Sequence, residues 1–205
     1  MSHFDIKDRF RGFLPVVIDV ETGGLNTERN SLLELAASYI NINLHGKFII
    51  EETEHYHIHP HPNTIIDPIS LTINNIIPDN PLRYAIKEGD CLKKLFKNIH
   101  LKLKQTKCSR AILVGHNPSF DLSFINAAIK RSHVKNNPLH KFSTFDTATL
   151  SGLVYGETVL SKALNKANID FDDAQAHGAL YDTKKTAELF CQILNNFPFL
   201  PVGIE

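Results

Sequence analysis

A short β-branched run, Val16 to Val20, narrows the folds that are open to this chain. Apolar residues on both faces of a strand are typical of a sheet that is covered on both sides. A second run of this kind spans Ala111 to Val114. Two such strands in one chain favour an α/β architecture, in which helices flank a central sheet.

The remaining patterns place strands first and then alternate helices with strands. We expect strands over residues 32–42, 47–59 and 142–145, and helices over 82–104, 118–132 and 179–195. Prolines between these segments, from Pro60 to Pro81, indicate loops and short helices. The order predicts a single domain over residues 1–205, with a mixed central β-sheet flanked by helices and a core of about residues 14–196.

Composition excludes several classes of protein. With 42% hydrophobic and 21% charged residues, the chain is neither largely disordered nor collagen-like. Its apolar runs are far too short to span a bilayer, and no apolar segment follows the N-terminal residues, so we expect neither a membrane protein nor a secreted one. Three cysteines without C-x-x-C spacing fit a reducing cytoplasm.

Charge is distributed unevenly along a chain whose net charge is zero. Residues 93–141 hold eleven Lys and Arg but one acid, Asp121. Clustered cations gain affinity for nucleic acids by displacing phosphate counterions. The segment therefore indicates a polyanionic partner, although solvated helix faces would also account for it.

Two acidic residues lie at the C-terminal end of the first expected buried strand. Asp19 and Glu21 are two residues apart, so in a strand both carboxylates point to the same side. Buried acids are costly unless they are paired, hydrogen-bonded or bound to a metal. The pair Gly23-Gly24 follows at once and permits a tight turn beside them. Taken alone, this pattern is equally consistent with a cap or a buried salt bridge.

Two further segments carry acids beside helix starts. Asn117 suits a helix N-cap, which places Asp121 in the first turn, where an acid also complements the helix dipole. His177 and Asp182 would not share a face of one helix, because five residues rotate by about 500°. Both reach one site only if His177 lies on a loop before the helix, a loop that Gly178 would ease. A surface histidine and a solvated aspartate are the alternative.

The three segments together are more specific than any one of them. Four carboxylates gathered at one site would repel strongly, by about 4 kcal/mol for each pair ~4 Å apart at an effective dielectric near 20. Oxygen-preferring divalent cations, Mg²⁺ or Mn²⁺, relieve that repulsion. A histidine beside such a cluster, with no cysteine near it, suits a general base better than a zinc ligand.

The order D-x-E, N-x-x-x-D and H-x-x-x-x-D resembles that of the DEDDh exonucleases, which have the ribonuclease H-like fold. Three longer segments, 9–22, 142–148 and 176–183, are similar to the ribonuclease T family among them. The resemblance covers nearly the whole chain. It implies a 3′→5′ exoribonuclease that trims single-stranded 3′ ends of tRNA and other stable RNA precursors, and that also degrades single-stranded DNA.

The resemblance also implies the roles of the acidic residues. It makes Asp19, Glu21, Asp121 and Asp182 both catalytic residues and ligands of two Mg²⁺ per subunit, for which Mn²⁺ can substitute, and His177 the general base. Hydrolysis would release nucleoside 5′-monophosphates. Asp146 matches a nearby acid to which we assign a supporting role only.

Nucleic-acid contacts and a homodimer are implied in the same way. The residues at the family's nucleic-acid-binding positions are Leu25, Ile73, Phe120, Phe142, Arg9, Arg11, Lys104, Arg110 and Lys135. In the family the basic patch of one subunit holds RNA for the active site of the other. Leu25 and Ile73 replace stacking phenylalanines, and Ile69 replaces a base-contacting glutamate, so the preference for particular 3′ bases is left open.

Two other functions compete with this one. A proofreading DNA exonuclease resembling the polymerase III epsilon subunit would use the same chemistry, but the basic patch and the segment Arg9-Phe10-Arg11 argue against it. A binding module with an inactive exonuclease fold would have lost a carboxylate or the histidine, and none is lost.

A second histidine-rich segment could imitate a metal site. His55, His57, His59 and His61 alternate along an expected strand and would share a face. No distinct acid beyond Glu54 completes a set of ligands, and prolines interrupt the spacing. We therefore expect an exposed, histidine-rich face.

Overall fold

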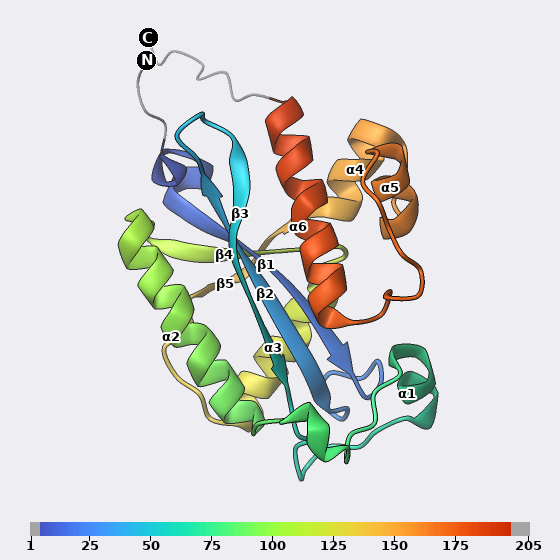
Figure 1. The fold of residues 1–205 in the computed structure, drawn as a ribbon. Helices are drawn as coiled ribbons and strands as arrows, with labels where there is room; N and C mark the ends of the chain where they lie inside the picture. Colours follow the sequence, from blue (N-terminus) through green and yellow to red (C-terminus); the bar gives the residue numbers. More distant parts are fainter. Residues whose placement is uncertain (1–4, 198–205) are drawn as a thin grey trace.

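A mixed five-stranded sheet forms the centre of the protein, in a computed structural model that describes residues 5–197 (Figure 1). Its strands are β1 (Phe13–Thr22), β2 (Leu32–Ile42), β3 (Phe48–His57), β4 (Arg110–Gly115) and β5 (Leu139–Asp146), in the spatial order β3-β2-β1-β4-β5. β1, β2 and β3 pair antiparallel, whereas β4 and β5 run parallel to β1. The mixed sheet predicted from the sequence is confirmed.

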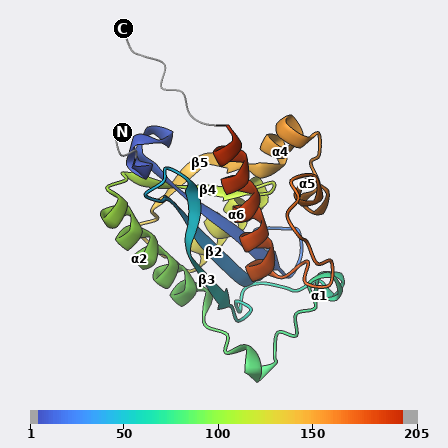
Figure 2. The same ribbon diagram turned by 45° about the horizontal axis from the view of Figure 1, so that its top comes forward.

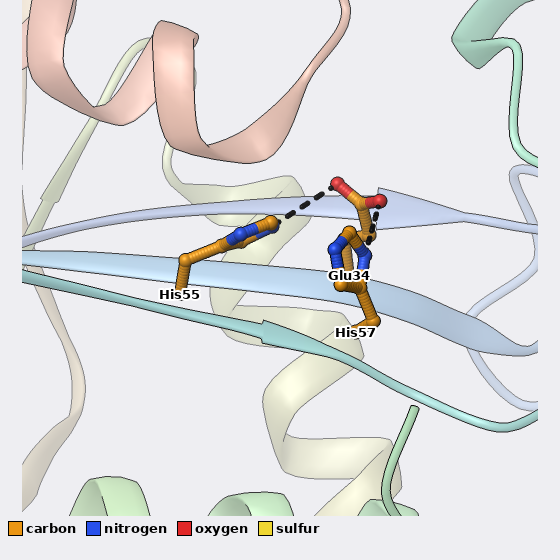
Figure 3. A group of neighbouring side chains, drawn as sticks. All are labelled: Glu34, His55 and His57. Atoms are coloured by element: carbon orange, nitrogen blue, oxygen red, sulfur yellow. Dashed lines mark hydrogen bonds and ion pairs between the residues drawn. The ribbon is translucent and has the colours of Figure 1, made fainter. Parts of the chain in front are cut away.

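Helices cover both faces of this sheet. α6 (Ala179–Asn196) packs on β1, β2 and β3, and α2 (Glu88–Thr106) and α3 (Ser119–Arg131) lie on the opposite face (Figures 1 and 3). Shorter helices are η1 (Ile6–Asp8), η2 (Phe10–Gly12), α1 (Pro68–Asn74), η3 (Pro81–Arg83), α4 (Thr147–Tyr155) and α5 (Leu160–Lys166). Figure 2 shows α4 and α5 beside α6, and α1 near the end at which α6 begins.

The core explains why β1 lies at the centre. Val16, Val17 and Ile18 are fully or almost fully buried, so both faces of this strand are covered. They belong to one large apolar cluster that also takes residues from α2, α3 and α6. A smaller cluster, built around Leu164 and Leu189, fixes α5 against α6. Burying both faces of β1 holds its C-terminal end rigidly, and that end carries Asp19 and Glu21.

Several expected boundaries differ from the structure. The helix expected over 82–104 begins only at Glu88, because η3 ends at Arg83 and Ile86 then forms a β-bridge with Ile58. The N-cap of α3 is Pro118, while Asn117 takes a left-handed conformation with φ of 65°. α4 and α5 were not expected. α4 combines β-branched residues with a glycine, a weak helical pattern, and it is stabilised at its ends by the Asp146 cap and by Gly156.

No helix among residues 5–197 is long and apolar enough to cross a membrane.

Candidate active site

Three carboxylates meet where β1 ends beneath the first turn of α6. Asp19 and Glu21 project from β1 toward α6, and Asp182 lies in the first turn of that helix. One oxygen from each of the three lies within 4.8 Å of the others. Residues from opposite ends of the chain thus form one acidic centre, as the sequence predicts.

The fourth carboxylate, Asp121, enters from the start of α3. Its Oδ1 accepts a hydrogen bond of 3.0 Å from the backbone N–H of Val20, the residue between the two β1 acids. Only 5% of Asp121 is exposed. Its charge acts on both Asp19 and Glu21. Asp121 is therefore part of the same centre and does more than complement the helix dipole.

Burial and mutual repulsion oppose ionisation throughout this centre. Burial, followed by the charges of neighbouring carboxylates, raises the pKa of Asp19 well above its usual range. The same causes raise the pKa of Glu21 to about 8, although a hydrogen bond with Asn74 acts in the opposite direction. Burial raises the pKa of Asp121 to about 7, against the effect of its backbone hydrogen bonds. These acids therefore lack nearby positive charge that would stabilise their ionised forms at neutral pH.

His177 lies on the loop before α6, as its spacing from Asp182 requires. Its backbone N–H donates a hydrogen bond of 3.1 Å to Asp182 Oδ2, and its side chain is exposed. The left-handed residue of this loop is His177 itself, with φ of 63°, while Gly178 is extended. An exposed imidazole beside Asp182 is in the position expected for a general base.

The residues present fit divalent cations. The second oxygen of Asp182, Oδ1, is buried and has no hydrogen-bond partner within residues 5–197. An unpaired buried carboxylate oxygen is costly unless a cation takes it as a ligand. Oxygen donors alone, with no thiolate or imidazole in the set, favour Mg²⁺ or Mn²⁺. Asp19, Glu21, Asp121 and Asp182 would hold these ions.

Two residues beside the centre had no distinctive sequence signal. Asn74, the last residue of α1, is buried and donates to the backbone oxygen of Thr22 while contacting Glu21. Glu34 lies directly opposite Glu21 in the β1–β2 register. A single acid in the apolar segment 32–42 was the available hint, but the strand register that gives it meaning is not readable from the sequence.

The histidine-rich segment differs from expectation. His55 and His57 are only partly exposed, and both contact the carboxylate of Glu34, at 3.3 and 2.8 Å (Figure 3). The expectation of an exposed face without a distinct acid is therefore wrong for these two residues, because β2 supplies the acid. His59 and His61 lie beyond the strand and are not in this cluster.

Apolar side chains are exposed at positions where the resemblance places nucleotide contacts. Leu25 is 85% exposed in the loop after β1, and Phe142 is 80% exposed on β5. Ile69 and Ile73 are exposed on α1. Phe120 differs, because it is partly buried and packs on the ring of Phe124. The exposed members of this set are accessible to a nucleic-acid base.

The basic residues lie at the other end of the sheet. Arg9 and Arg11 precede β1, and Arg110 begins β4, where it pairs with Phe13. Lys104 is in the last turn of α2, and Lys135 precedes β5. We call these five residues the basic patch; Arg11, Lys104, Arg110 and Lys135 are exposed, and Arg9 is half-buried. From Phe13 to Glu21, β1 spans about 26 Å at the usual rise per residue, so the patch is distant from the acidic centre of its own chain.

Part of the positive charge of residues 93–141 is neutralised within the protein. Lys102 pairs with Glu51 and Glu52, and Arg131 pairs with the buried Glu88. The cationic surface is therefore smaller than the sequence count suggests.

Asp146 has a structural position. Its side chain accepts hydrogen bonds from Ala148 at the start of α4 and from the backbone N–H of Asn117. It thereby joins the loop before α3 to α4, which agrees with the supporting role expected for it.

Comparison with known proteins identifies the class to which this fold and centre belong. Residues 16–190 match the family model RNase_T, described as exonuclease, and the chain belongs to that family. It is 51% identical to ribonuclease T of Baumannia cicadellinicola over 94% of this chain and 88% of that protein, and 50% identical to ribonuclease T of Yersinia enterocolitica over 94% and 89%. The protein is accordingly a metal-dependent 3′→5′ exonuclease of the ribonuclease T type.

Solved structures share the fold at lower identity. The nuclease domain of 3′hExo, a DEDDh family member bound to rAMP, has a TM-score of 0.71 at 24% identity, over 89% of this chain and 92% of that one. Exonuclease I of E. coli in complex with a dT13 oligonucleotide has a TM-score of 0.68 at 16% identity, over 88% and 41%. These likenesses confirm the ribonuclease H-like α/β fold predicted from the sequence.

Proposed function

We propose that this exoribonuclease trims the single-stranded 3′ ends of tRNA and other stable RNA precursors, and that it also degrades single-stranded DNA. The observation that carries the proposal is the acidic centre, in which an unpaired oxygen of Asp182 lies beside the β1 carboxylates and next to the loop of His177. The name ribonuclease T of the relatives supports RNA as substrate. The dT13 oligonucleotide of exonuclease I supports single-stranded DNA as a second substrate.

In this proposal the four carboxylates would hold two divalent cations, Mg²⁺ or Mn²⁺, which would supply positive charge at the scissile phosphodiester. Asp19, Glu21 and Asp182 hold them from β1 and α6, and Asp121 does so from α3 while its bond to Val20 fixes its orientation. His177 takes the proton of the attacking water, and its exposed position lets it pass that proton to solvent. The water oxygen bonds to phosphorus as the bond from phosphorus to the 3′ oxygen of the preceding nucleotide breaks. That oxygen takes a proton from solvent and becomes the new 3′ hydroxyl, and a nucleoside 5′-monophosphate is released.

The terminal nucleotides would bind along the exposed apolar residues. Leu25 and Ile73 would give the last bases an exposed apolar surface, and Phe120 directly precedes Asp121. Phe142, two residues before the Thr144 that pairs with Leu113, lies toward the basic-patch end of the sheet and would contact an RNA that bridges two subunits. Aliphatic side chains at two of these positions stack less strongly than aromatic rings. We infer that this protein binds the last bases more weakly, and discriminates less between different 3′ bases, than the resemblance alone implies.

We further propose a homodimer. The basic patch lies too far from the acidic centre of the same chain to hold the nucleotides next to the scissile bond. A second copy, packed in the opposite direction, would bring its patch to this centre, and RNA would then bridge the two subunits. Residues 1–205 would act as one exonuclease domain in the cytoplasm.

The test is an end-trimming assay. The protein is incubated with Mg²⁺ and either a tRNA with extra 3′ residues or the same RNA with a blocked 3′ end. We expect stepwise shortening and nucleoside 5′-monophosphates from the first RNA only. Internal cleavage, 3′-phosphate products, or activity confined to DNA would contradict the proposal; the last result would favour the proofreading function.

A further inference from the structure

Glu34, His55 and His57 form a second cluster of potential metal ligands on the α6 face of the sheet (Figure 3). The antiparallel register explains why they meet. Glu34 lies opposite His57 in the β2–β3 pair, and His55, two residues earlier on β3, points to the same face. One ligand atom from each residue lies within 4.8 Å of the others. The resemblance and the proposed reaction assign no role to this cluster.

The contacts within the cluster converge on a single carboxylate. Nδ1 of His57 lies 2.8 Å from Glu34 Oε1, and Nε2 of His55 lies 3.3 Å from Oε2. Ligand atoms around a tetrahedral Zn²⁺ are about 3.4 Å apart, given bonds of about 2.0–2.2 Å to nitrogen and oxygen. Small side-chain rotations would therefore bring all three atoms around one ion.

The carboxylate of Glu34 is fixed between the two rings. Its side chain is 11% exposed, and each of its two oxygens faces one imidazole nitrogen. Arg83 is near, with Nη2 at 3.8 Å from Oε1, but its hydrogen bond of 2.8 Å goes to the backbone oxygen of Leu33. The guanidinium thus balances charge without taking the lone pairs of the carboxylate.

The donor set selects a different metal from the acidic centre. Mg²⁺ requires an oxygen-rich, octahedral shell, whereas two imidazoles and one carboxylate suit Zn²⁺. The side chains of His55 and His57 are 22% and 33% exposed, which leaves a fourth position open to water. We propose that Glu34, His55 and His57 bind one Zn²⁺ per chain, at a site separate from the four catalytic carboxylates.

The proposed Zn²⁺ site would lie beside the acidic centre on the same face of the sheet. Across the sheet, His57 pairs with Glu34 and Glu34 pairs with Glu21. A cation at the new site adds positive charge beside acids that also attract cations. By linkage, Zn²⁺ here and Mg²⁺ at the acidic centre weaken each other's binding.

The experiment measures Zn²⁺ binding to the full chain by titration calorimetry in excess Mg²⁺. The wild type should bind one Zn²⁺ per chain, and so should Asp19→Asn/Asp182→Asn, in which the acidic centre is disabled. His55→Gln/His57→Gln should lose that equivalent. The matched control is His59→Gln/His61→Gln, which removes two neighbouring histidines outside the cluster and should retain it.

Two results would overturn the proposal. One is equal Zn²⁺ stoichiometry in the wild type and in a folded His55→Gln/His57→Gln protein, as judged by circular dichroism. The other needs no variant: Co²⁺ added in excess Mg²⁺ should give the intense visible absorption of a four-coordinate, imidazole-bound ion. Weak absorption, typical of six oxygen ligands, would mean that Glu34 and the histidines are only a hydrogen-bonded group.

Discussion

Each carboxylate of the acidic centre is wholly or partly buried, at a cost that its hydrogen bonds do not offset. Asp121 has a backbone hydrogen bond from Val20, and Asp182 has one from His177, yet burial raises the pKa of both acids. Burial and the charges of Asp121, Glu21, Asp182 and Glu34 also raise the pKa of Asp19. Without cations, such residues lower the stability of the folded chain. Removing one should therefore reduce turnover but raise the stability of the metal-free protein.

Asp19→Asn should reduce turnover by about 10³-fold, an effect typical of losing one electrostatic group at a reacting centre. In EDTA at neutral pH the same variant should melt at a higher temperature than the wild type, because folding no longer requires this acid to be buried or protonated. Trimming rates and thermal melts measure the two effects. Asp170→Asn, which alters an exposed acid, should change neither. Turnover close to that of the wild type in Asp19→Asn would exclude it as a metal ligand.

His177→Ala should lower kcat by about 10²–10⁴-fold, the usual contribution of a general base. The side chain is exposed and its contact with Asp182 is made by the backbone, so the affinity for RNA should be nearly unchanged. Steady-state kinetics separates the two effects. A raised KM with unchanged kcat would assign His177 to substrate binding instead.

The short helix α1 links the exposed residues Ile69 and Ile73 to the acidic centre. Its exposed face carries Ile69 and Ile73, while its last residue, Asn74, is buried against Glu21 and the Thr22 backbone. The same two turns of α1 thus offer a surface for a nucleotide base on one side and contact the carboxylate of Glu21 on the other. Changes on the exposed face should act on nucleotide binding and leave the carboxylates in place.

Ile73→Phe should tighten binding of a single-stranded 3′ end about fivefold or more, since a base stacked on an aromatic ring is worth about 1–3 kcal/mol. Fluorescence anisotropy with a 5′-labelled oligonucleotide in EDTA measures the affinity without cleavage. Ile77→Phe is the matched control, because Ile77 is also exposed but lies beyond the end of α1. Equal gains in both variants would point to a nonspecific hydrophobic effect.

The elements that the sequence predicted best are those whose own side chains determine them. The β-branched run at Val16 predicts β1 and its burial, and the spacing between His177 and Asp182 requires a loop before α6. Features that depend on contacts with distant segments of the chain could not be predicted from the sequence. The contact of Glu34 with His55 and His57 depends on strand register, and α4 depends on a cap supplied by Asp146 at the end of β5.

For the molecule as a whole, the acidic centre couples stability to pH. Glu21 and Asp121 have pKa values of about 8 and about 7 in the folded chain, above the ordinary 4.5 and 3.8. Acids with a raised folded pKa bind more protons when folded than when unfolded. Their favourable contribution is complete below the ordinary pKa and is lost as the pH rises through the folded value.

In EDTA the melting temperature should therefore fall between about pH 4.5 and pH 8, by several degrees at about 2–4 °C per kcal/mol for a chain of this size. Excess Mg²⁺ should restore most of the loss at pH 8, because it binds only the ionised acids of the folded state. Asp19→Asn should flatten the profile. A melting temperature that rises with pH in EDTA would contradict this linkage.

The basic patch should control the salt dependence of RNA binding. Replacing Arg9, Arg11 and Arg110 by glutamine should reduce the slope of log affinity against log salt by about 0.7 for each phosphate that the variant no longer neutralises. Replacing Lys93, Lys94 and Lys97, which lie on α2 away from the patch, is the control. An unchanged slope in the arginine variant would exclude the patch as an RNA-binding surface, and analytical ultracentrifugation of both variants shows whether the dimer persists.

The acidic centre takes its first carboxylates from β1 and its last from α6, the final helix described. A ribosome making this protein releases Asp182 only after every strand of the described sheet has emerged. Until then the nascent polypeptide has an incomplete set of these carboxylates. We therefore expect it to hydrolyse RNA only after the sheet beneath the acidic centre has been made.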